Sequence, residues 1–246
     1  MLFVMGVAVV MLGLAGCSNA QAKDEKAKSK MEVQVTDDGA VVETKYVRVE
    51  YKECFPVKYA KYDDLLRKSS NINQYFDETE CRLGMFNKKV ALIAGDTKEI
   101  SEDPKAAVES LQKMLKEKGV TIQITIIVGD GNTKYKVKLL KPKKQDLPAD
   151  IKKVVMNLEA ALADLEVMEK QTKETAKEAV TLVPVCTSLI NSAPTDFTGL
   201  DARFAPKAAT RLKDASSELT SAADRAKKVG TKLQELAKIL KETFKG

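Results

Sequence analysis

The C-terminal part of this chain carries an unbroken heptad repeat of apolar residues, which constrains the fold more than any other feature of the sequence. Alanine, valine and leucine recur in steps of four and three residues over more than four heptads. This spacing predicts one long helix with a single apolar seam. Monomeric proteins rarely expose a continuous apolar stripe, so another helix must cover the seam. The seam positions are Ala208, Leu212, Ala215, Leu219, Ala222, Ala226, Val229, Leu233, Leu236 and Leu240.

A matching apolar repeat precedes this seam and supplies its nearest partner. Pro148 is placed to open a helix, and Pro184 is expected to bend or break that helix because proline removes a backbone donor and clashes with the preceding turn. Residues 192–195 and Gly199 are expected to reverse the chain. The range 144–246 is therefore predicted to form an antiparallel helical hairpin that packs within the chain and projects from the preceding domain.

The range 32–143 is predicted to form a small mixed α/β domain. All six tyrosines of the 246-residue chain lie in this range, whereas no aromatic residue occurs between residues 136 and 196. Alternating apolar and polar residues indicate strands, and Gly or Asp between them indicates a hairpin turn. The expected elements are a strand at Val33 and Val35, a turn at Asp38-Gly39, a strand over 47–51, a helix over 59–68 that ends at 69–71, and a strand over 90–94.

The clearest signal in this domain is a helix followed by a strand. Asp103 is a natural N-cap with Pro104 at the first helical position, and Gly119 stands where a helix C-cap belongs. Residues 120–128 then alternate as a strand and lead through a Gly-rich turn into another. Together with the strand at 90–94, this order predicts a right-handed crossover and a parallel strand pair. The predicted fold class is α+β, a mixed α/β domain followed by a coiled-coil-like helical hairpin.

The N-terminus carries the signal that bears on location. Residues 2–15 are almost wholly apolar, which suits the core of a signal peptide and falls short of the roughly 20 residues that span a bilayer. The run ends in Leu14-Ala15-Gly16-Cys17, and this segment resembles the lipobox of bacterial lipoprotein precursors. The resemblance implies cleavage after Gly16 and acylation of Cys17, and Ser18 in the next position favours the outer membrane by analogy.

This resemblance divides the N-terminal region into two parts. Residues 1–16 are expected to be a lipoprotein signal peptide, and 17–31 a flexible tether, because 18–31 hold small and charged side chains without core formers. The expected location is the cell envelope, with the protein held to the membrane through lipid on Cys17. The resemblance identifies a processing class and no functional family.

Three cysteines remain after the lipidated one. An extracytoplasmic compartment permits disulfides, and of the three possible pairings we favour Cys54 with Cys81, because both lie in the same predicted domain. Closing this loop would stabilise the fold by about 3 kcal/mol in the chain-entropy treatment. Cys186 occupies an apolar helical position and is expected to be a buried thiol.

A row of lysines marks the last strand of the predicted domain. Alternate lysines share one strand face, while Tyr135, Val137 and Leu139 share the other. The row predicts either an anion-binding patch for phosphate or carboxylate polymers, or a solvated face whose lysines protect a strand edge. The candidate anion-binding residues are Lys134, Lys136, Lys138, Lys141, Lys143 and Lys144.

Composition excludes several kinds of chemistry. The chain contains no histidine, so catalytic triads, imidazole bases and His-ligated zinc are excluded. No spacing of acidic residues identifies a metal site, and we expect no metal, no cofactor and no catalytic activity. Lys plus Arg number 41 against 35 Asp plus Glu, and this net charge of +6 is too small to indicate nucleic acid.

The sequence therefore favours a non-catalytic, lipid-anchored envelope protein with a binding or scaffold role. Its partner is expected to be an envelope protein or an anionic envelope polymer. Two alternatives stay open: a membrane-active helical hairpin, and an envelope hydrolase using acidic residues. The acidic candidates for a hydrolase are Asp63, Asp64, Asp77, Glu78 and Glu80.

Overall fold

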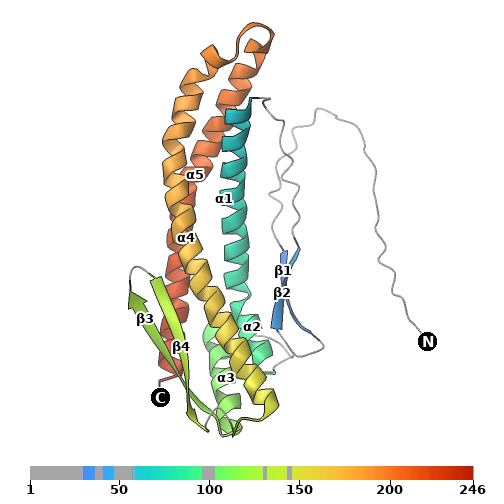
Figure 1. Ribbon diagram of the computed structural model, residues 1–246, viewed down its shortest axis with the longest axis vertical. Coiled ribbons are helices and arrows are strands. Elements are labelled where there is room, and N and C mark those ends of the chain that lie inside the picture. Colours follow the sequence, from blue (N-terminus) through green and yellow to red (C-terminus); the bar gives the residue numbers. More distant parts are fainter. Residues whose placement is uncertain are drawn as a thin grey trace, which may run out of the picture.

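Long helices form most of the molecule, and two antiparallel strand pairs lie against them (Figure 1). The computed structural model describes residues 30–36, 41–46, 57, 59–95, 103–129, 132–142 and 146–245. The elements are β1 (Lys30–Val35), β2 (Val41–Tyr46), α1 (Ala60–Gly84), α2 (Phe86–Ile93), α3 (Pro104–Glu117), β3 (Thr121–Gly129), β4 (Asn132–Lys141), α4 (Ala149–Asp196), the 3-10 helix η2 (Gly199–Phe204) and α5 (Ala205–Thr243). The α+β class is confirmed.

The C-terminal hairpin follows from the heptad seam. Helices α4 and α5 run antiparallel side by side along the length of the molecule (Figure 1). Every predicted seam position of α5 is buried except Ala226, which is partly buried against the same core. The partner of the seam is therefore α4 of the same chain, as the sequence predicts.

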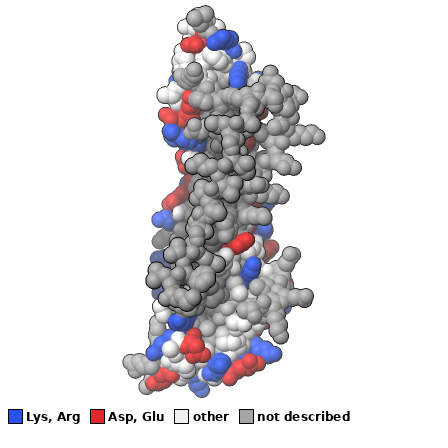
Figure 2. Space-filling view, turned by 90° about the vertical axis from the view of Figure 1, so that its right-hand side faces the viewer, with Lys and Arg blue, Asp and Glu red and all other residues white. Residues whose placement is uncertain are grey.

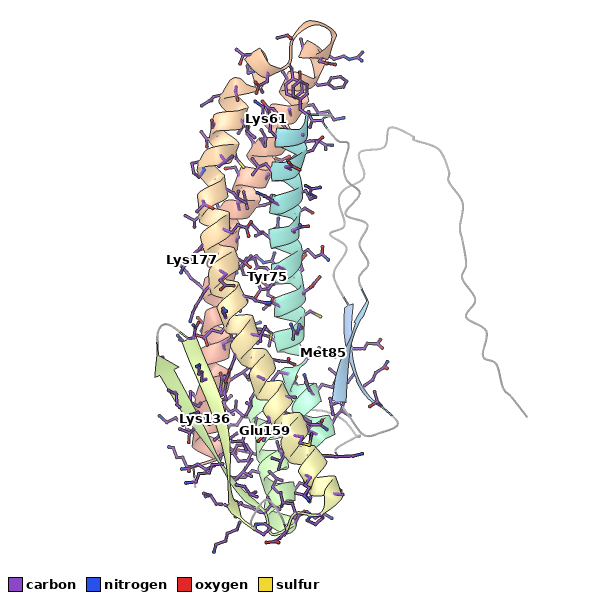
Figure 3. The ribbon with its side chains drawn as sticks, viewed as in Figure 1. Lys61, Tyr75, Met85, Lys136, Glu159 and Lys177 are labelled. Carbon is purple, nitrogen blue, oxygen red and sulfur yellow. The ribbon has the colours of Figure 1, made fainter. Side chains whose placement is uncertain are left out.

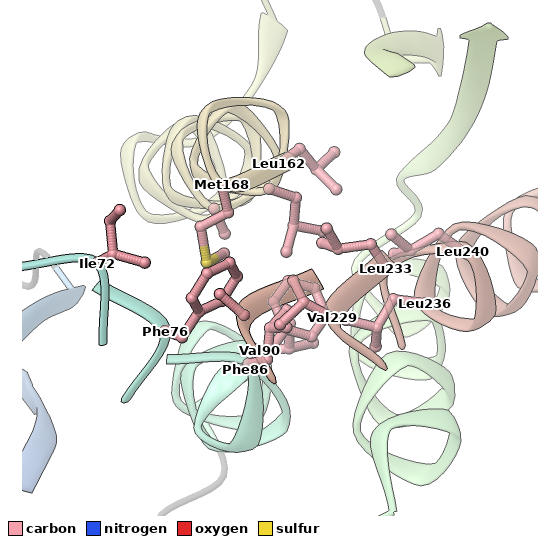
Figure 4. Packing of buried hydrophobic residues seen from close by; sticks show 14 of the residues in the cluster. Ile72, Phe76, Phe86, Val90, Leu162, Met168, Val229, Leu233, Leu236 and Leu240 are labelled. Carbon is pink, nitrogen blue, oxygen red and sulfur yellow. The ribbon is translucent and has the colours of Figure 1, made fainter. Parts of the chain in front are cut away.

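Helix α1 covers a further side of this hairpin, so the hairpin does not project as a free rod. Ile72 and Phe76 of α1 meet Met168 of α4 in one cluster, into which α5 inserts Val229 and Leu233 (Figure 4). The same cluster takes in buried side chains of α2 and α3 and the first half of β3. The core thus continues across the boundary predicted near residue 144.

Helix α1 is longer than the sequence indicates. It was expected to end at 69–71, because Ser and Asn compete with the helical backbone for hydrogen bonds, but it continues to Gly84. Ser69 is 1% exposed, and its hydroxyl donates to the carbonyl oxygen of Ala215 at 3.4 Å. A small side chain here lets α1 approach α5 closely, so tertiary packing outweighs the local preference.

The predicted strand at 90–94 is wrong, because these residues belong to the helix α2. Phe86, Val90 and Ile93 are spaced to share one helix face, and all three are buried. The expected parallel pair is therefore wrong as well, since β3 pairs with β4 in an antiparallel ladder. A short apolar run fits a buried helix as well as a strand, and only its packing decides between them.

The predicted helix caps and the first predicted hairpin can also be compared with the structure. The Asp103 side chain accepts a hydrogen bond from the backbone nitrogen of Lys105 at 2.9 Å, and Gly119 has φ +72°, so both predicted helix caps are confirmed. An antiparallel strand pair at the start of the predicted domain is confirmed, with β2 as the partner of β1. The predicted turn at Asp38-Gly39 and the predicted strand at 47–51 lie outside the described residues.

Helix α4 passes through Pro184 and Pro194 without ending, and the chain reverses only after Phe197. Pro184 and Val180 are exposed, so the carbonyl that loses its partner lies on the solvent side. The predicted break is therefore wrong. Gly199 does take part in the reversal, with φ +59°.

The first turn of α1 is joined to the last turn of α4. The Tyr62 hydroxyl donates to an oxygen of the Asp196 carboxylate at 2.7 Å and to the carbonyl of Leu189 at 3.1 Å. Lys61 forms an ion pair with the same carboxylate at 2.6 Å. Burial, followed by the hydrogen bond to Asp196, raises the pKa of Tyr62 to about 12. The reversal end of the hairpin is thus tied to the start of α1.

Candidate anion-binding face of the β3–β4 hairpin

The ladder between β3 and β4 sorts their side chains onto two faces. The partners Gln123–Lys138, Thr125–Lys136 and Ile127–Lys134 lie opposite each other across the ladder. Because side chains alternate along a strand, all six point to one side of the hairpin. We call this side the basic face, consisting of Gln123, Thr125, Ile127, Lys134, Lys136 and Lys138.

The opposite face of the hairpin docks on the helices. Ile122 and Ile124 are 4% and 3% exposed, and Tyr135, Val137 and Leu139 pack against the same core. The backbone nitrogen of Ile124 also donates to the carbonyl of Phe244 beyond the end of α5, at 3.4 Å. The hairpin is therefore fixed to the body by one face, and its basic face points away.

Two glutamates of α4 cover the outer edge of β4. The backbone nitrogen of Tyr135 donates to Oε1 of Glu166 at 2.6 Å, and that of Thr133 donates to Oε2 of Glu169 at 3.1 Å. Lys173 neutralises Glu169 from the next helical turn at 2.5 Å. Unpaired strand edges invite further pairing. Here α4, and not the lysine row, protects this part of the edge.

These contacts change the protonation behaviour of both partners. Partial burial works against the charged form of Glu169, but hydrogen bonds from Lys173 and Thr133 outweigh it and lower the pKa of this carboxyl group. Burial, and then the charges of Glu169 and Glu166, raise the pKa of the Tyr135 phenol. At neutral pH the carboxylate is therefore charged and the phenol neutral.

The lysines of the basic face are exposed and compensated by no carboxylate that the structure describes. Lys134, Lys136 and Lys138 are all exposed, and Lys136 is marked on the strand in Figure 3. Within the described parts of the chain, none of the three forms an ion pair. Alternate residues of a strand lie about 7 Å apart, so the row extends over about 14 Å. Lys141 is also exposed, and Lys143 and Lys144 lie outside the described residues.

The opposite side of the molecule has a different charge pattern. On the face that Figure 2 shows, basic and acidic side chains of the described residues lie close to each other. The uncompensated row on β4 therefore differs from the charge pattern of the opposite face. It is the arrangement that attracts a polyanion, because its positive charges add along a line.

Two features of this site were missed in the sequence. The contacts from Glu166 and Glu169 to β4 join residues more than 30 positions apart, and no local pattern signals them. The exposed apolar pair Ile127 and Val128 did leave a signal, since Ile126-Ile127-Val128 interrupts the alternation of the strand. An apolar residue on the outer face of a docked hairpin has no core to enter.

Each of the five acidic candidates has a hydrogen-bond or ion-pair partner within the chain. Asp77 and Glu80 both bind Arg225 of α5, at 2.5 and 2.8 Å, and the guanidinium lies 5.4 Å from the centre of the Phe76 ring. The remaining three have partners of their own: Asp63 accepts from the backbone nitrogen of Val57, Asp64 pairs with Arg67, and Glu78 accepts from Gln74.

The cysteine predictions have a divided outcome. Cys186 is fully buried, as expected, and burial raises the pKa of its thiol. Cys81 is a free thiol in this structure, and Cys54 lies outside the described residues, as does Cys17. The Cys54–Cys81 disulfide is thus not found and stays a prediction. Among the residues described, no group of His, Cys, Asp or Glu is arranged to hold a metal, and no helix is long and apolar enough to cross a membrane.

Comparison with protein-family models, with curated proteins and with solved structures gives no match. The functional argument therefore rests on the residues of this chain.

Proposed function

We propose that this protein is a non-catalytic, lipid-anchored component of the bacterial cell envelope, and that its basic face binds an anionic partner there. The anchor is the lipid expected on Cys17, and the location by analogy is the outer membrane. The helical body serves as a scaffold that holds the basic face in a fixed orientation. The partner is an envelope component that carries phosphate or carboxylate groups.

The observation that carries the binding proposal is the uncompensated lysine row on a docked hairpin. Glu166 and Glu169 already protect the edge of β4, so edge protection does not account for the lysines at this end of the strand. The inner face is fixed to the core, so the row is held in a rigid line. A rigid row loses little conformational freedom on binding, which favours recognition of a repeating anion.

The anchor is tested by replacing the acylated thiol. Cys17→Ser is expected to abolish incorporation of labelled palmitate and to leave an unprocessed or soluble chain. Ser18→Ala, which keeps the thiol, is the matched control and is expected to incorporate label normally. Palmitate incorporation into the Cys17→Ser chain would refute the lipid anchor.

The basic face is tested by removing its three lysine charges together. The Lys134→Gln, Lys136→Gln, Lys138→Gln chain is expected to bind immobilised lipopolysaccharide or wall polymer about tenfold more weakly, because each exposed ion pair contributes a few tenths to 1 kcal/mol. The difference should shrink above about 0.1 M salt, where charges are screened within about 10 Å.

The control for this experiment removes the same charge elsewhere. Lys177, Lys228 and Lys232 are exposed residues of α4 and α5 and are not part of the hairpin. Changing these three to Gln is expected to leave retention close to that of the wild type. Equal retention of both triple variants at low salt would refute an anion site on the basic face.

A further inference from the structure

Two apolar side chains at the end of β3 are exposed to solvent. Along the inner face of β3, Ile122 and Ile124 are buried and Ile126 is partly buried, but Val128 is 76% exposed. On the outer face Ile127 is 41% exposed. Both side chains are therefore open to solvent, although β4 beside them is held to α4, since the backbone nitrogen of Thr133, opposite Val128, donates to Glu169.

Ile127 and Val128 of β3 differ from the exposed apolar residues of α4. Met156, Val167, Val180 and Val185 are separated from one another along that helix, and single exposed apolar residues are normal on protein surfaces. Ile127 and Val128 are consecutive, on a strand end that both faces leave open to solvent.

The basic face begins at the same place. Ile127 lies opposite Lys134, and Lys136 and Lys138 follow along the same side of the hairpin. A lipid surface has a hydrocarbon layer covered by charged headgroups. The two apolar side chains suit the hydrocarbon layer, and the lysines next to them suit the headgroups. Lysine stems also tolerate an apolar boundary while their ammonium groups stay at the headgroup level.

We propose that this end of the hairpin contacts an anionic lipid bilayer, with Ile127 and Val128 entering the interface and the lysines of the basic face binding lipid phosphates. The inference rests on the proposed function for the choice of an anionic partner and identifies that partner as a lipid surface. A hydrated wall polymer would bind the lysines but would offer nothing to Ile127 and Val128. It would leave the two apolar side chains in water, whereas a bilayer removes them from it.

The absence of tryptophan from the chain makes a direct test possible. The full chain with Val128→Trp is purified from membranes and reconstituted into vesicles of phosphatidylcholine alone or with phosphatidylglycerol. The introduced indole then reports its own surroundings, and Val128 is exposed enough to accept it without disturbing the core. Val180→Trp, at a site that is 60% exposed on the shaft of α4, is the matched control.

The expected result is a shift of Val128→Trp emission to shorter wavelength, with quenching by brominated lipid, in the phosphatidylglycerol vesicles. Both signals should weaken in phosphatidylcholine alone and be lost when Lys134, Lys136 and Lys138 are also changed to Gln. They should persist when Lys177, Lys228 and Lys232 are changed instead. The Val180→Trp chain should show neither signal in either vesicle.

The outcomes that overturn the inference separate it from the proposed function. If the Val128→Trp chain shows no shift and no quenching, but the basic-face Gln variant still loses polymer retention, the lipid contact is wrong and the anion site stands. If neither measurement responds to the lysines, both proposals fall. A shift of equal size in both vesicles would refute the role of the lysines in the contact.

Discussion

Two of the antiparallel hairpins in the molecule, α4–α5 and β3–β4, bury their apolar side chains in opposite ways. In the α4–α5 hairpin the apolar seam is covered along its whole length, because a helical repeat presents the same face at every turn. In the β3–β4 hairpin burial falls off along β3 toward its end, and one face of the hairpin never enters the core. The two long helices bury their apolar residues in one core together with α1, whereas the strand hairpin docks on the helices by one face and leaves its other face exposed.

The largest expected effect comes from breaking the seam of the helical hairpin. Leu219 is 1% exposed, and Leu219→Asp should lower the free energy of unfolding by about 3–5 kcal/mol, because it buries a carboxylate without a partner. Thermal unfolding measures this loss, and Ser217→Asp at an exposed site of the same helix is the control.

Sedimentation shows whether the seam packs within one chain or between two chains. The wild type and the Leu219→Asp chain are expected to sediment in the same class, since α4 and α5 pack within one chain. A wild-type oligomer that the substitution converts into a folded monomer would contradict the internal hairpin and favour an oligomerisation rod.

The next effect contrasts two positions on one face of β3. Ile124→Ala should cost about 2–4 kcal/mol, because it leaves a cavity in a packed core. Val128→Ala on the same face should change stability by less than about 0.5 kcal/mol, because that side chain already contacts water. Denaturant unfolding of the two variants measures the difference. Similar losses at both positions would mean that the turn end is docked as firmly as the base.

A smaller effect is expected where α1 is tied to α5. Arg225→Met should cost about 2 kcal/mol, because Asp77 and Glu80 then lose the cation that neutralises them in a partly buried site. Lys227→Met removes a pair with Asp224 that is mostly exposed and should cost less than about 0.5 kcal/mol. Chemical unfolding at low ionic strength compares them, and equal losses would exclude a special role for Arg225.

The smallest effect concerns the edge of β4 and depends on pH. Folding lowers the pKa of Glu169, so this group stabilises the fold above its unfolded pKa, and the stabilisation disappears as pH falls through the lower, folded value. Glu169→Gln should cost about 0.5–1 kcal/mol at pH 7. The melting temperatures of the two chains should converge as the solution is acidified below about pH 4. A difference in melting temperature that stays constant down to pH 2 would contradict a stabilising role of the charged Glu169 carboxylate.

How far the sequence determines the fold depends on whether the relevant contact is local. Residues within a few positions of one another set the seam from Ala208 to Leu240, the cap at Asp103 and the two strands β3 and β4. The continuation of α1 through Ser69 depends on Ala215, which is 146 residues away. No window of local sequence contains that information.

The candidate site also has features that local sequence determines and features that depend on distant contacts. The strand period places Lys134, Lys136 and Lys138 on one face, so the row was predictable. The parallel partner expected for the neighbouring strand at 120–128 was wrong, because the apolar run at 90–94 suits either secondary structure and forms a helix. The exposure of Val128 depends on how the hairpin docks on the helices, a property of elements far apart in the sequence.

The bond from Tyr62 to Asp196 joins residues 134 apart in the sequence, and this separation bears on the order of folding. Helices α4 and α5 are consecutive and meet through a short reversal, so their hairpin closes at a small entropic cost. Helix α1 can complete its contacts only on a surface that this hairpin already provides. We expect Tyr62→Phe to speed unfolding while leaving the folding rate unchanged, a φ-value near zero in stopped-flow kinetics. Folding then proceeds against the direction of synthesis, and α1, although made early, waits for the C-terminal half of the chain.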